Sequence, residues 1–403
     1  TTASLNSYVE EMIVGLKVSD MFDHHPEDLK AFDQYNNALK NSAIKAHTNA
    51  LRKTPMIVSL SYFNYAISAV VGAIFVLNNY ISLGKLGSYL IYVRQSSTPF
   101  NNFTTQLNDL YNGLPGAERI FSFLDLSPEV DEGKITLVSA VEISGKIVET
   151  EHPTNALAWK KPNGDGTYSY KIFRGRVDFN NVSFGYKENE PVLKNITLYA
   201  DKGEKIALVG STGAGKTTVV NLISRFYNLT AGSILIDGEH DISKVTLHSL
   251  RSQMGIMLQD SFIFSGTIMD NIRYGRLDAT DQEVIAAAKA VHAHDFISEM
   301  SKGYHTEVNE RGSRLSAGQK QLISFARTLL ADPRILILDE ATSAIDTKTE
   351  RLLQEGIKVL LKGRTSFIIA HRLSTIKSCD KILYIGDRSI LEEGSHDELI
   401  AQK

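Results

Sequence analysis

The sequence predicts an α-helical membrane segment followed by an α/β domain built around a parallel sheet. Three observations lead to this prediction. Residues 56–77 form an apolar run that contains no charged side chain. A glycine-rich loop at 210–215 lies between a short apolar stretch and a helical pattern. The apolar run 335–338 ends in two carboxylates, and such continuous runs are typical of strands buried on both faces.

Length and composition set the first limits. A chain of 403 residues is longer than a typical single domain, so we expect two units. Its 43 Lys and Arg and 46 Asp and Glu give a net charge of -3, which offers no basic surface for nucleic acid. Cys379 is the single cysteine and cannot form an internal disulfide, as expected in a reducing compartment. Because Thr1 opens a pattern that reads as a running helix, we expect an N-terminally truncated sequence.

Residues 4–53 are expected to form two long polar helices. Apolar residues recur there at helical spacing and Pro26 interrupts the pattern, which predicts a turn or a small helix around 19–26. His24 and His25 are adjacent, so they do not share a helix face, and no ligand cluster accompanies them. We therefore do not predict a metal site there, because structural sites need about four clustered ligands.

Two membrane crossings are expected after these helices. Residues 56–77, at about 1.5 Å per residue, are long enough to cross a hydrocarbon core of ~30 Å. Arg52 and Lys53 place the start of this run in the cytosol. Residues 78–84 then form an external turn, and 86–103 form a second, less apolar crossing. Connectivity favours this second crossing, since a single one would leave the following soluble domain outside the cell.

Arg94 lies near the middle of the second crossing. An ionisable residue at membrane depth usually faces a bundle interior or an aqueous cavity, so Arg94 either lines a substrate path or pairs structurally with a neighbour. Residues 116–126 are expected to form the helical exit into the cytosol. The linker 128–174 follows, and its alternating runs at 134–138 and 168–173 favour small added strands. No chemistry is assigned to the linker or to its Trp159.

The glycine-rich loop matches the phosphate-loop motif in the strand, loop and helix context that the motif requires. It follows the apolar stretch 205–209, precedes the helical pattern 219–226, and consists of Gly210, Ser211, Thr212, Gly213, Ala214, Gly215, Lys216, Thr217 and Thr218. Glycines let backbone amides surround phosphate oxygens, and the helix start adds partial positive charge. We expect Lys216 to neutralise the β- and γ-phosphates of ATP and the Thr217 hydroxyl to coordinate Mg²⁺.

Asp339 and Glu340 directly follow the apolar run 335–338, which we expect to be a buried strand. Ligands of open α/β sheets bind at the carboxyl ends of strands, so Asp339 is predicted to hold Mg²⁺ and Glu340 to act as the general base for water. An acidic pair after a core strand is often merely solvated. Because this pair occurs in the same sequence as a phosphate loop, we favour the catalytic interpretation. Ser316 is placed to cap the helix that covers 320–330, and amides at such a helix start can receive an anion.

The order of these motifs resembles the complete nucleotide-binding domain of ATP-binding cassette (ABC) transporters, over 175–403. The residues that carry the resemblance are Tyr186, 210–217, Gln259, 315–319, 335–340, 343–346 and His371. Residues 1–127, including 117–121 (AERIF), resemble the exporter branch of the family from the cytosolic end of its fourth transmembrane helix onward. The resemblance implies a phosphate-loop ATPase fold of ABC type with an antiparallel β subdomain and a helical signature subdomain.

Roles for further residues follow from the resemblance. Tyr186 would stack on adenine, Gln259 would sense the metal and the attacking water, and His371 would hold the γ-phosphate. Ser316, Gly318, Gln319 and Asp346 would complete the nucleotide site across a head-to-tail pair of domains. The turn at 19–26 resembles a coupling helix that contacts an ATPase domain. One departure is Ala317, where the family usually has glycine, and another is the unusual length of the linker 128–174.

The resemblance also implies partners and location. The expected protein is a multi-pass half-transporter of the plasma membrane with a cytoplasmic ATPase domain, paired with an identical or a different half-transporter in the lipid bilayer. It would export an amphipathic small molecule, lipid or peptide. One alternative is a soluble cassette ATPase, which the apolar run 56–77 argues against. Another is an inactive regulatory partner, which would lack Lys216, Glu340 or His371, and all three are present. The cargo does not follow from the sequence.

Overall fold

The computed structural model describes residues 2–401 except 153, 155, 188–189, 259–260, 309–311, 313, 340–345 and 371. It does not describe the side chains at 49–54, 57, 97, 100–101, 104–105, 108 and 112 either. The chain divides into two compact units, Thr1–Pro128 and Glu129–Lys403.

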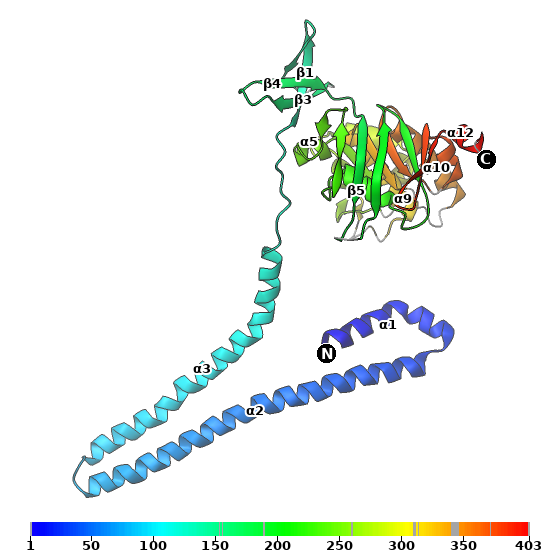
Figure 1. Ribbon diagram of the computed structural model, residues 1–403. Helices are drawn as coiled ribbons and strands as arrows, with labels where there is room; N and C mark the ends of the chain where they lie inside the picture. The colour runs from blue at the N-terminus through cyan, green and yellow to red at the C-terminus, as the bar shows by residue number, and fades with distance from the viewer. Residues whose placement is uncertain are drawn as a thin grey trace. The chain divides into compact units, whose positions relative to one another are not determined.

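The first unit is helical. In its described part it contains α1 (Thr2–Phe22), α2 (His25–Leu77) and α3 (Leu83–Leu124). The hydroxyl of Tyr8 on α1 donates a hydrogen bond of 2.9 Å to the backbone oxygen of Asp28 on α2, so the two helices pack together after a sharp turn (Figure 1). Asp23 makes that turn with a φ of 53°. The predicted arrangement of helix, turn and helix is therefore confirmed, with no separate small helix at 19–26.

The helices α2 and α3 form an antiparallel hairpin (Figure 1). A methyl group on Gly72 would overlap Leu86 Cδ1, so glycine allows the buried Leu86 to pack closely against α2. Within the described residues, Val58–Leu77 is the one stretch long and apolar enough to cross a membrane, and it lies inside the predicted run 56–77. The second crossing, expected at 86–103, lies in α3 and stays a prediction.

The linker between the two expected domains is a folded sheet. It is antiparallel, with the order β2-β1-β3-β4, and comprises β1 (Thr136–Ile143), β2 (Lys146–Glu149), β3 (Leu157–Pro162) and β4 (Tyr168–Ile172). The strands predicted at 134–138 and 168–173 are thus confirmed. We call residues 136–172 the insert sheet. Its Trp159 is buried and donates a hydrogen bond of 3.1 Å from Nε1 to Asp237 Oδ2.

Two further sheets form the body of the second unit. The antiparallel sheet has the order β6-β5-β8-β9 and consists of β5 (Val177–Phe184), β6 (Leu193–Ala200), β8 (Ala231–Ile236) and β9 (His240–Asp241). The larger sheet has the order β10-β13-β14-β7-β15-β16, and all its strand pairs are parallel except β15 with β16. It comprises β7 (Lys205–Val209), β10 (Met254–Met257), β13 (Ile335–Asp339), β14 (Thr365–Ile369), β15 (Lys381–Gly386) and β16 (Ser389–Gly394).

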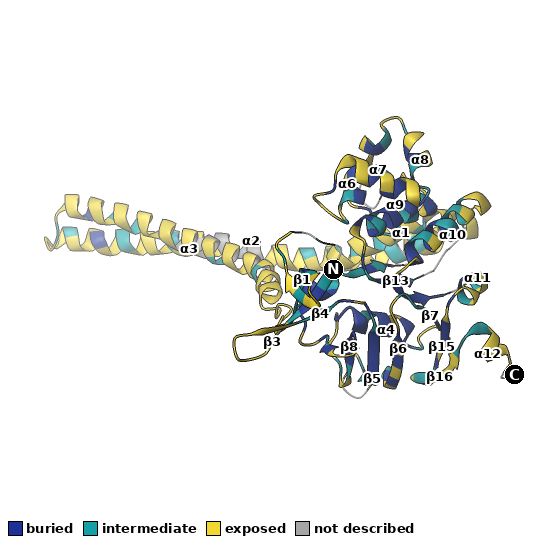
Figure 2. Ribbon diagram, turned by 90° about the horizontal axis from the view of Figure 1, so that it is seen from above, coloured by how far each residue is buried: buried dark blue, intermediate teal, exposed yellow. Residues whose placement is uncertain are grey.

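The larger sheet separates two hydrophobic cores. Successive side chains of a strand point to opposite faces, so Ile335 and Ile337 of β13 enter one core while Leu336 and Leu338 enter the other. Figure 2 shows this sheet as largely buried, in contrast to the mostly exposed α2 and α3. The uninterrupted apolar run 335–338 is explained by this double burial, and the predicted fold class is confirmed.

Helices cover the sheets and form a separate helical part. They are α4 (Lys216–Ile223), α5 (Leu247–Arg251), α6 (Ile268–Arg273), α7 (Asp281–Ala290), α8 (His294–Ser298), α9 (Ala317–Ala331), α10 (Thr347–Leu361), α11 (Leu373–Lys377) and α12 (His396–Ala401). A small ribbon of β11 (Gly266–Thr267) and β12 (Glu307–Val308), with the 3-10 turn Gly303–His305, accompanies α6 to α8.

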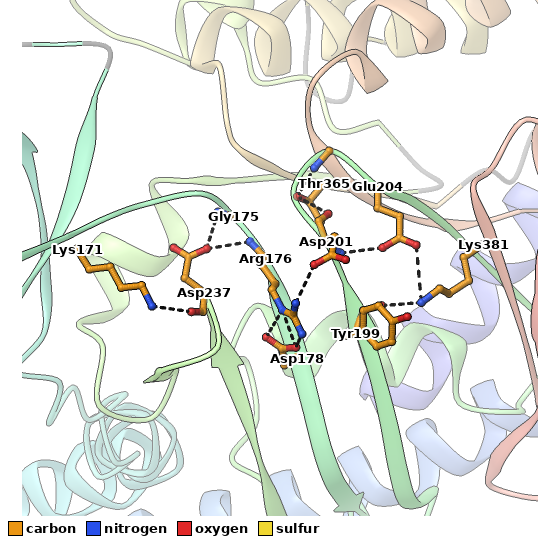
Figure 3. A network of polar contacts seen from close by, with 11 residues as sticks. Lys171, Gly175, Arg176, Asp178, Tyr199, Asp201, Glu204, Asp237, Thr365 and Lys381 are labelled. Atoms are coloured by element: carbon orange, nitrogen blue, oxygen red, sulfur yellow. Dashed lines mark hydrogen bonds and ion pairs between the residues drawn. The ribbon is translucent and has the colours of Figure 1, made fainter.

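A polar network ties the end of the insert sheet to the two sheets of the body (Figure 3). Asp237 Oδ1 accepts hydrogen bonds from the backbone amides of Gly175 and Arg176 at 2.9 and 3.0 Å. The Arg176 guanidinium then forms ion pairs with Asp178 on β5 and with Asp201, which directly follows β6. Arg176 therefore links the start of β5 to the end of β6. The segment that connects the insert sheet to the body is therefore held by specific hydrogen bonds and ion pairs.

Candidate nucleotide site

The predicted phosphate loop connects β7 to α4. Gly213 and Gly215 have φ values of 83° and 105°, a region that favours glycine, and Gly215 is the residue before the first turn of α4. A methyl group on Gly210 would overlap the backbone oxygen of Ile385. These glycines therefore occupy positions where a side chain would strain the loop or collide with β15.

Lys216 and the residues after it open α4. The Lys216 ammonium is buried and donates two hydrogen bonds of 2.8 Å to the backbone oxygens of Gly210 and Ser211. The loop thus holds its own cation in place, using two of the three donors of that group. Thr217 is exposed on the first turn, while Thr218 is buried. An exposed hydroxyl at Thr217 suits an oxygen ligand of Mg²⁺.

Tyr186 lies beside the start of α4. Its hydroxyl is 3.2 Å from Thr218 Oγ1, and its ring packs edge to face against Phe184 at 5.0 Å and Tyr227 at 5.1 Å between centroids. The side chain is still 50% exposed. The neighbours fix the ring orientation and leave part of the ring open to solvent, as the predicted stacking on adenine requires.

The parallel sheet brings the other predicted residues toward the same edge. The carboxyl ends of β7, β14, β13 and β10 are successive in the sheet, and Asp339 is the last residue of β13. Gln259, Glu340 and His371 follow the ends of β10, β13 and β14 in the sequence, but these three residues lie outside the described part of the chain. Their predicted roles stay predictions.

The start of α9 is built as a capping box. Ser316 Oγ accepts a hydrogen bond of 3.2 Å from the Gln319 amide, and the Ser316 amide donates at 3.0 Å to Gln319 Oε1. Gly318 is buried within this turn. The side chains of Ser316 and Gln319 therefore satisfy the helix end in this structure, and their predicted contact with a nucleotide on a second copy remains a prediction.

Asp346, also predicted to take part in the nucleotide site, caps α10. Its Oδ1 accepts a hydrogen bond of 2.9 Å from the Thr349 amide, and this bond lowers the pKa of the Asp346 carboxyl. The charged form thus complements the positive end of the helix. Residues 343–345, which precede it in the predicted motif, lie outside the described residues.

A pocket of about 340 Å³ opens over the outer part of the phosphate loop. The pocket is lined by Pro191, Val192, Ser211, Thr212, Gly213, Ala214, Asp387 and Arg388. Asp387 and Arg388 form the turn between β15 and β16, and sequence reasoning did not single them out. The available signal was the short polar break between the apolar runs of two strands.

Comparisons with known proteins agree with this geometry. Residues 193–343 match the family model described as ABC transporter. An uncharacterized ABC transporter ATP-binding protein, YfiC of Bacillus subtilis, is 43% identical over 99% of this chain and 61% of its own length. A fatty acid ABC transporter ATP-binding/permease protein of Mycobacterium bovis is 39% identical over all of this chain and 58% of its own length.

A solved structure is also similar to this chain over almost its whole length. A bacterial Atm1-family ABC exporter with ATP bound superposes with a TM-score of 0.72 at 33% identity, covering 99% of this chain and 64% of the exporter chain. The present chain thus spans about three fifths of the length of these relatives. The similarity includes the helical unit as well as the domain that contains the phosphate loop.

Proposed function

We propose that this chain is part of an ABC exporter half-transporter, because the proteins that it matches are named ABC transporters and an ABC exporter. In this proposal the full-length protein uses MgATP hydrolysis to export an amphipathic molecule across the plasma membrane. The observation that carries the proposal is the phosphate loop, with its buried Lys216, at the sheet edge where β13 ends in Asp339. The apolar stretch Val58–Leu77 in the same chain supports a membrane protein rather than a soluble ATPase.

Each residue of the loop has a defined task in this proposal. The backbone amides of 211–216 and the ammonium of Lys216 bind the β- and γ-phosphates of the substrate ATP. Thr217 and Asp339 would hold Mg²⁺, since a hydroxyl and a carboxylate provide the oxygen ligands that this ion prefers. The ion, when bound, neutralises charge on the phosphate oxygens. Glu340 accepts the proton of the attacking water, which Gln259 and His371 orient.

The second half of the site comes from a partner. Ser316, Gly318 and Gln319 at the start of α9 would approach the triphosphate that a second half-transporter holds, with Asp346 at the same interface. The partner is either an identical subunit or a different one, in which case this chain is the catalytically complete member of the pair. ATP then joins the two domains, and hydrolysis lets them separate and move the membrane helices.

The cargo is proposed only as a class. The exposed apolar side chains of α2, including Val70 and Ile74, suit contact with lipid or with an amphipathic substrate, and one relative is named a fatty acid transporter. We therefore propose a lipid, an amphipathic small molecule or an amphipathic peptide. Arg94 on α3 is exposed within its own unit and is the candidate for a polar contact along the path.

Replacement of the general base tests the catalytic part of the proposal. We expect the full-length protein with Glu340→Gln to bind ATP as tightly as the unsubstituted protein while its MgATPase rate falls at least about 100-fold, because the water loses its proton acceptor. ATP binding by equilibrium dialysis and phosphate release are the two measurements. Unchanged hydrolysis in Glu340→Gln would reject Glu340 as the base.

Transport itself is tested in inside-out vesicles. The unsubstituted full-length protein, alone and with each candidate partner, should accumulate labelled fatty acids or other amphiphiles only when MgATP is supplied. Vesicles with Glu340→Gln serve as the control, because they contain a folded protein that binds ATP without cleaving it. Equal accumulation in both preparations would show that uptake does not depend on this ATPase.

A further inference from the structure

The turn between β15 and β16 has an unusual residue for its conformation. Gly386 pairs with Ser389, so Asp387 and Arg388 form a two-residue hairpin loop, with φ values of 46° and 68°. Such loops require positive φ at both positions and strongly prefer glycine at the second. The β1–β2 hairpin of the same chain follows this preference, because Ser144 and Gly145 occupy its loop at φ values of 52° and 76°.

The strained arginine lies next to the phosphate loop. Tyr384 of β15 pairs with Val209 at the end of β7, and the backbone of Gly210 approaches the Ile385 oxygen too closely to admit a methyl group. The Arg388 oxygen accepts a hydrogen bond of 2.7 Å from the Lys194 amide. These contacts hold the turn at the pocket that Ser211, Thr212 and Gly213 also line.

Non-glycine residues in the left-handed region persist when the surroundings impose them, and they cluster at functional sites. We propose that Arg388 is an additional binding residue of the nucleotide site, whose guanidinium attracts the triphosphate held by the phosphate loop. This proposal rests on the proposed function and deepens it. Asp387 lines the same pocket, and its carboxylate opposes the attraction, so the two residues should act on nucleotide affinity with opposite signs.

The test measures equilibrium binding of ATP, ADP and AMP to the full-length protein in detergent. Arg388→Gly should relieve the turn and weaken ATP binding by about 2- to 5-fold, the range of an exposed charge interaction. The loss should be largest for ATP, smaller for ADP and smallest for AMP, and it should shrink as salt is raised from about 0.05 M to about 0.5 M. Arg388→Lys should retain most of the affinity, whereas Asp387→Asn should tighten ATP binding.

A matched control separates backbone strain from charge. Ser144→Gly relieves a left-handed residue in the β1–β2 hairpin, outside the phosphate-loop pocket, and should leave ATP affinity unchanged. Thermal unfolding checks that each variant is folded. Equal ATP affinity in Arg388→Gly and the unsubstituted protein would overturn the inference, as would an equal loss in Arg388→Lys. Absence of ATP binding by the unsubstituted protein would instead overturn the proposed function.

Discussion

At the scale of the residue, the glycines of the phosphate loop are not equivalent. Gly210 and Gly213 both have positive φ, at 149° and 83°, but a side chain would meet different surroundings at the two positions. A methyl group on Gly210 would overlap the Ile385 oxygen of the neighbouring strand, whereas one on Gly213 has nothing within 4 Å. The motif alone does not distinguish a position limited by packing from one limited by conformation.

This difference predicts the rank of two alanine variants. Gly213→Ala should destabilise the protein by about 1 kcal/mol, the usual cost of a left-handed alanine. Gly210→Ala should cost roughly 3 kcal/mol or more, because β15 must move away from β7 to make room. Thermal unfolding of the purified full-length protein without nucleotide provides the measurement. Equal melting temperatures for the two variants would contradict this account of Gly210.

At the scale of the element, the insert sheet docks through a buried aromatic contact. The rings of Trp159 and His240 are 5.6 Å apart, and neither nitrogen of the buried His240 has a hydrogen-bond partner among the described residues. Burial lowers the pKa of His240 from its ordinary value of 6.5. The nearby charges act in both directions, since Glu239 and Asp237 raise this pKa while Lys171 and Lys161 lower it.

Docking of the insert sheet should therefore weaken in acid. His240 binds a proton less readily when docked than when exposed, so the docked state is fully stable above about pH 6.5 and loses stability as the pH falls below it. His240→Phe should remove this dependence, because phenylalanine fills the site without titrating. Hydrogen exchange of the Arg174, Gly175 and Arg176 amides, which donate to Asp237, reports the docking.

The control for this experiment is His152→Phe, which replaces an exposed histidine in the same insert sheet region. Its amide exchange should follow the unsubstituted protein at every pH, after correction for the intrinsic rate. The ratio of amide protection in His240→Phe to that in the unsubstituted protein should rise as the pH falls. The rise should be up to about tenfold per pH unit from pH 6.5 down to the folded-state pKa of His240. A constant ratio from pH 7.5 to pH 5 would rule out His240 as the titrating group.

At the scale of the whole molecule, the helical hairpin of α2 and α3 predicts a membrane topology. Residues 78–82 between the two helices should face the outside, and the second unit should lie in the cytosol. Cysteine labelling tests this, because Cys379 is the single cysteine of the chain and is buried. Any other cysteine of the full-length protein is first replaced by serine.

In intact cells, Asn78→Cys should react with a membrane-impermeant maleimide. Lys146→Cys, at an exposed position of the insert sheet, should react only after the cells are permeabilised. The two variants together distinguish two crossings from one, since a single crossing would place both positions on the same side. Labelling of Lys146→Cys in intact cells would contradict the predicted second crossing in α3.

Much of the fold and the phosphate loop could be predicted because their signals are local. The phosphate loop follows its strand and begins its helix within about a dozen residues, so its chemistry is readable from the run 205–218 alone. The turn at Asp23 and the apolar stretch 58–77 are likewise indicated by residues that are close together in the sequence. The continuous apolar run of β13 likewise reflects its burial against two cores.

The sequence by itself therefore determined the nucleotide motif, the long helices of the first unit and the resemblance to ABC transporters. Only the tertiary structure decided how the insert sheet docks on Asp237 and His240, and that the Asp387–Arg388 turn borders the phosphate loop. The physical reason is sequence distance. Trp159 and Asp237, or Tyr384 and Val209, meet through packing between segments far apart in the chain, and such contacts leave no local pattern of residues to read.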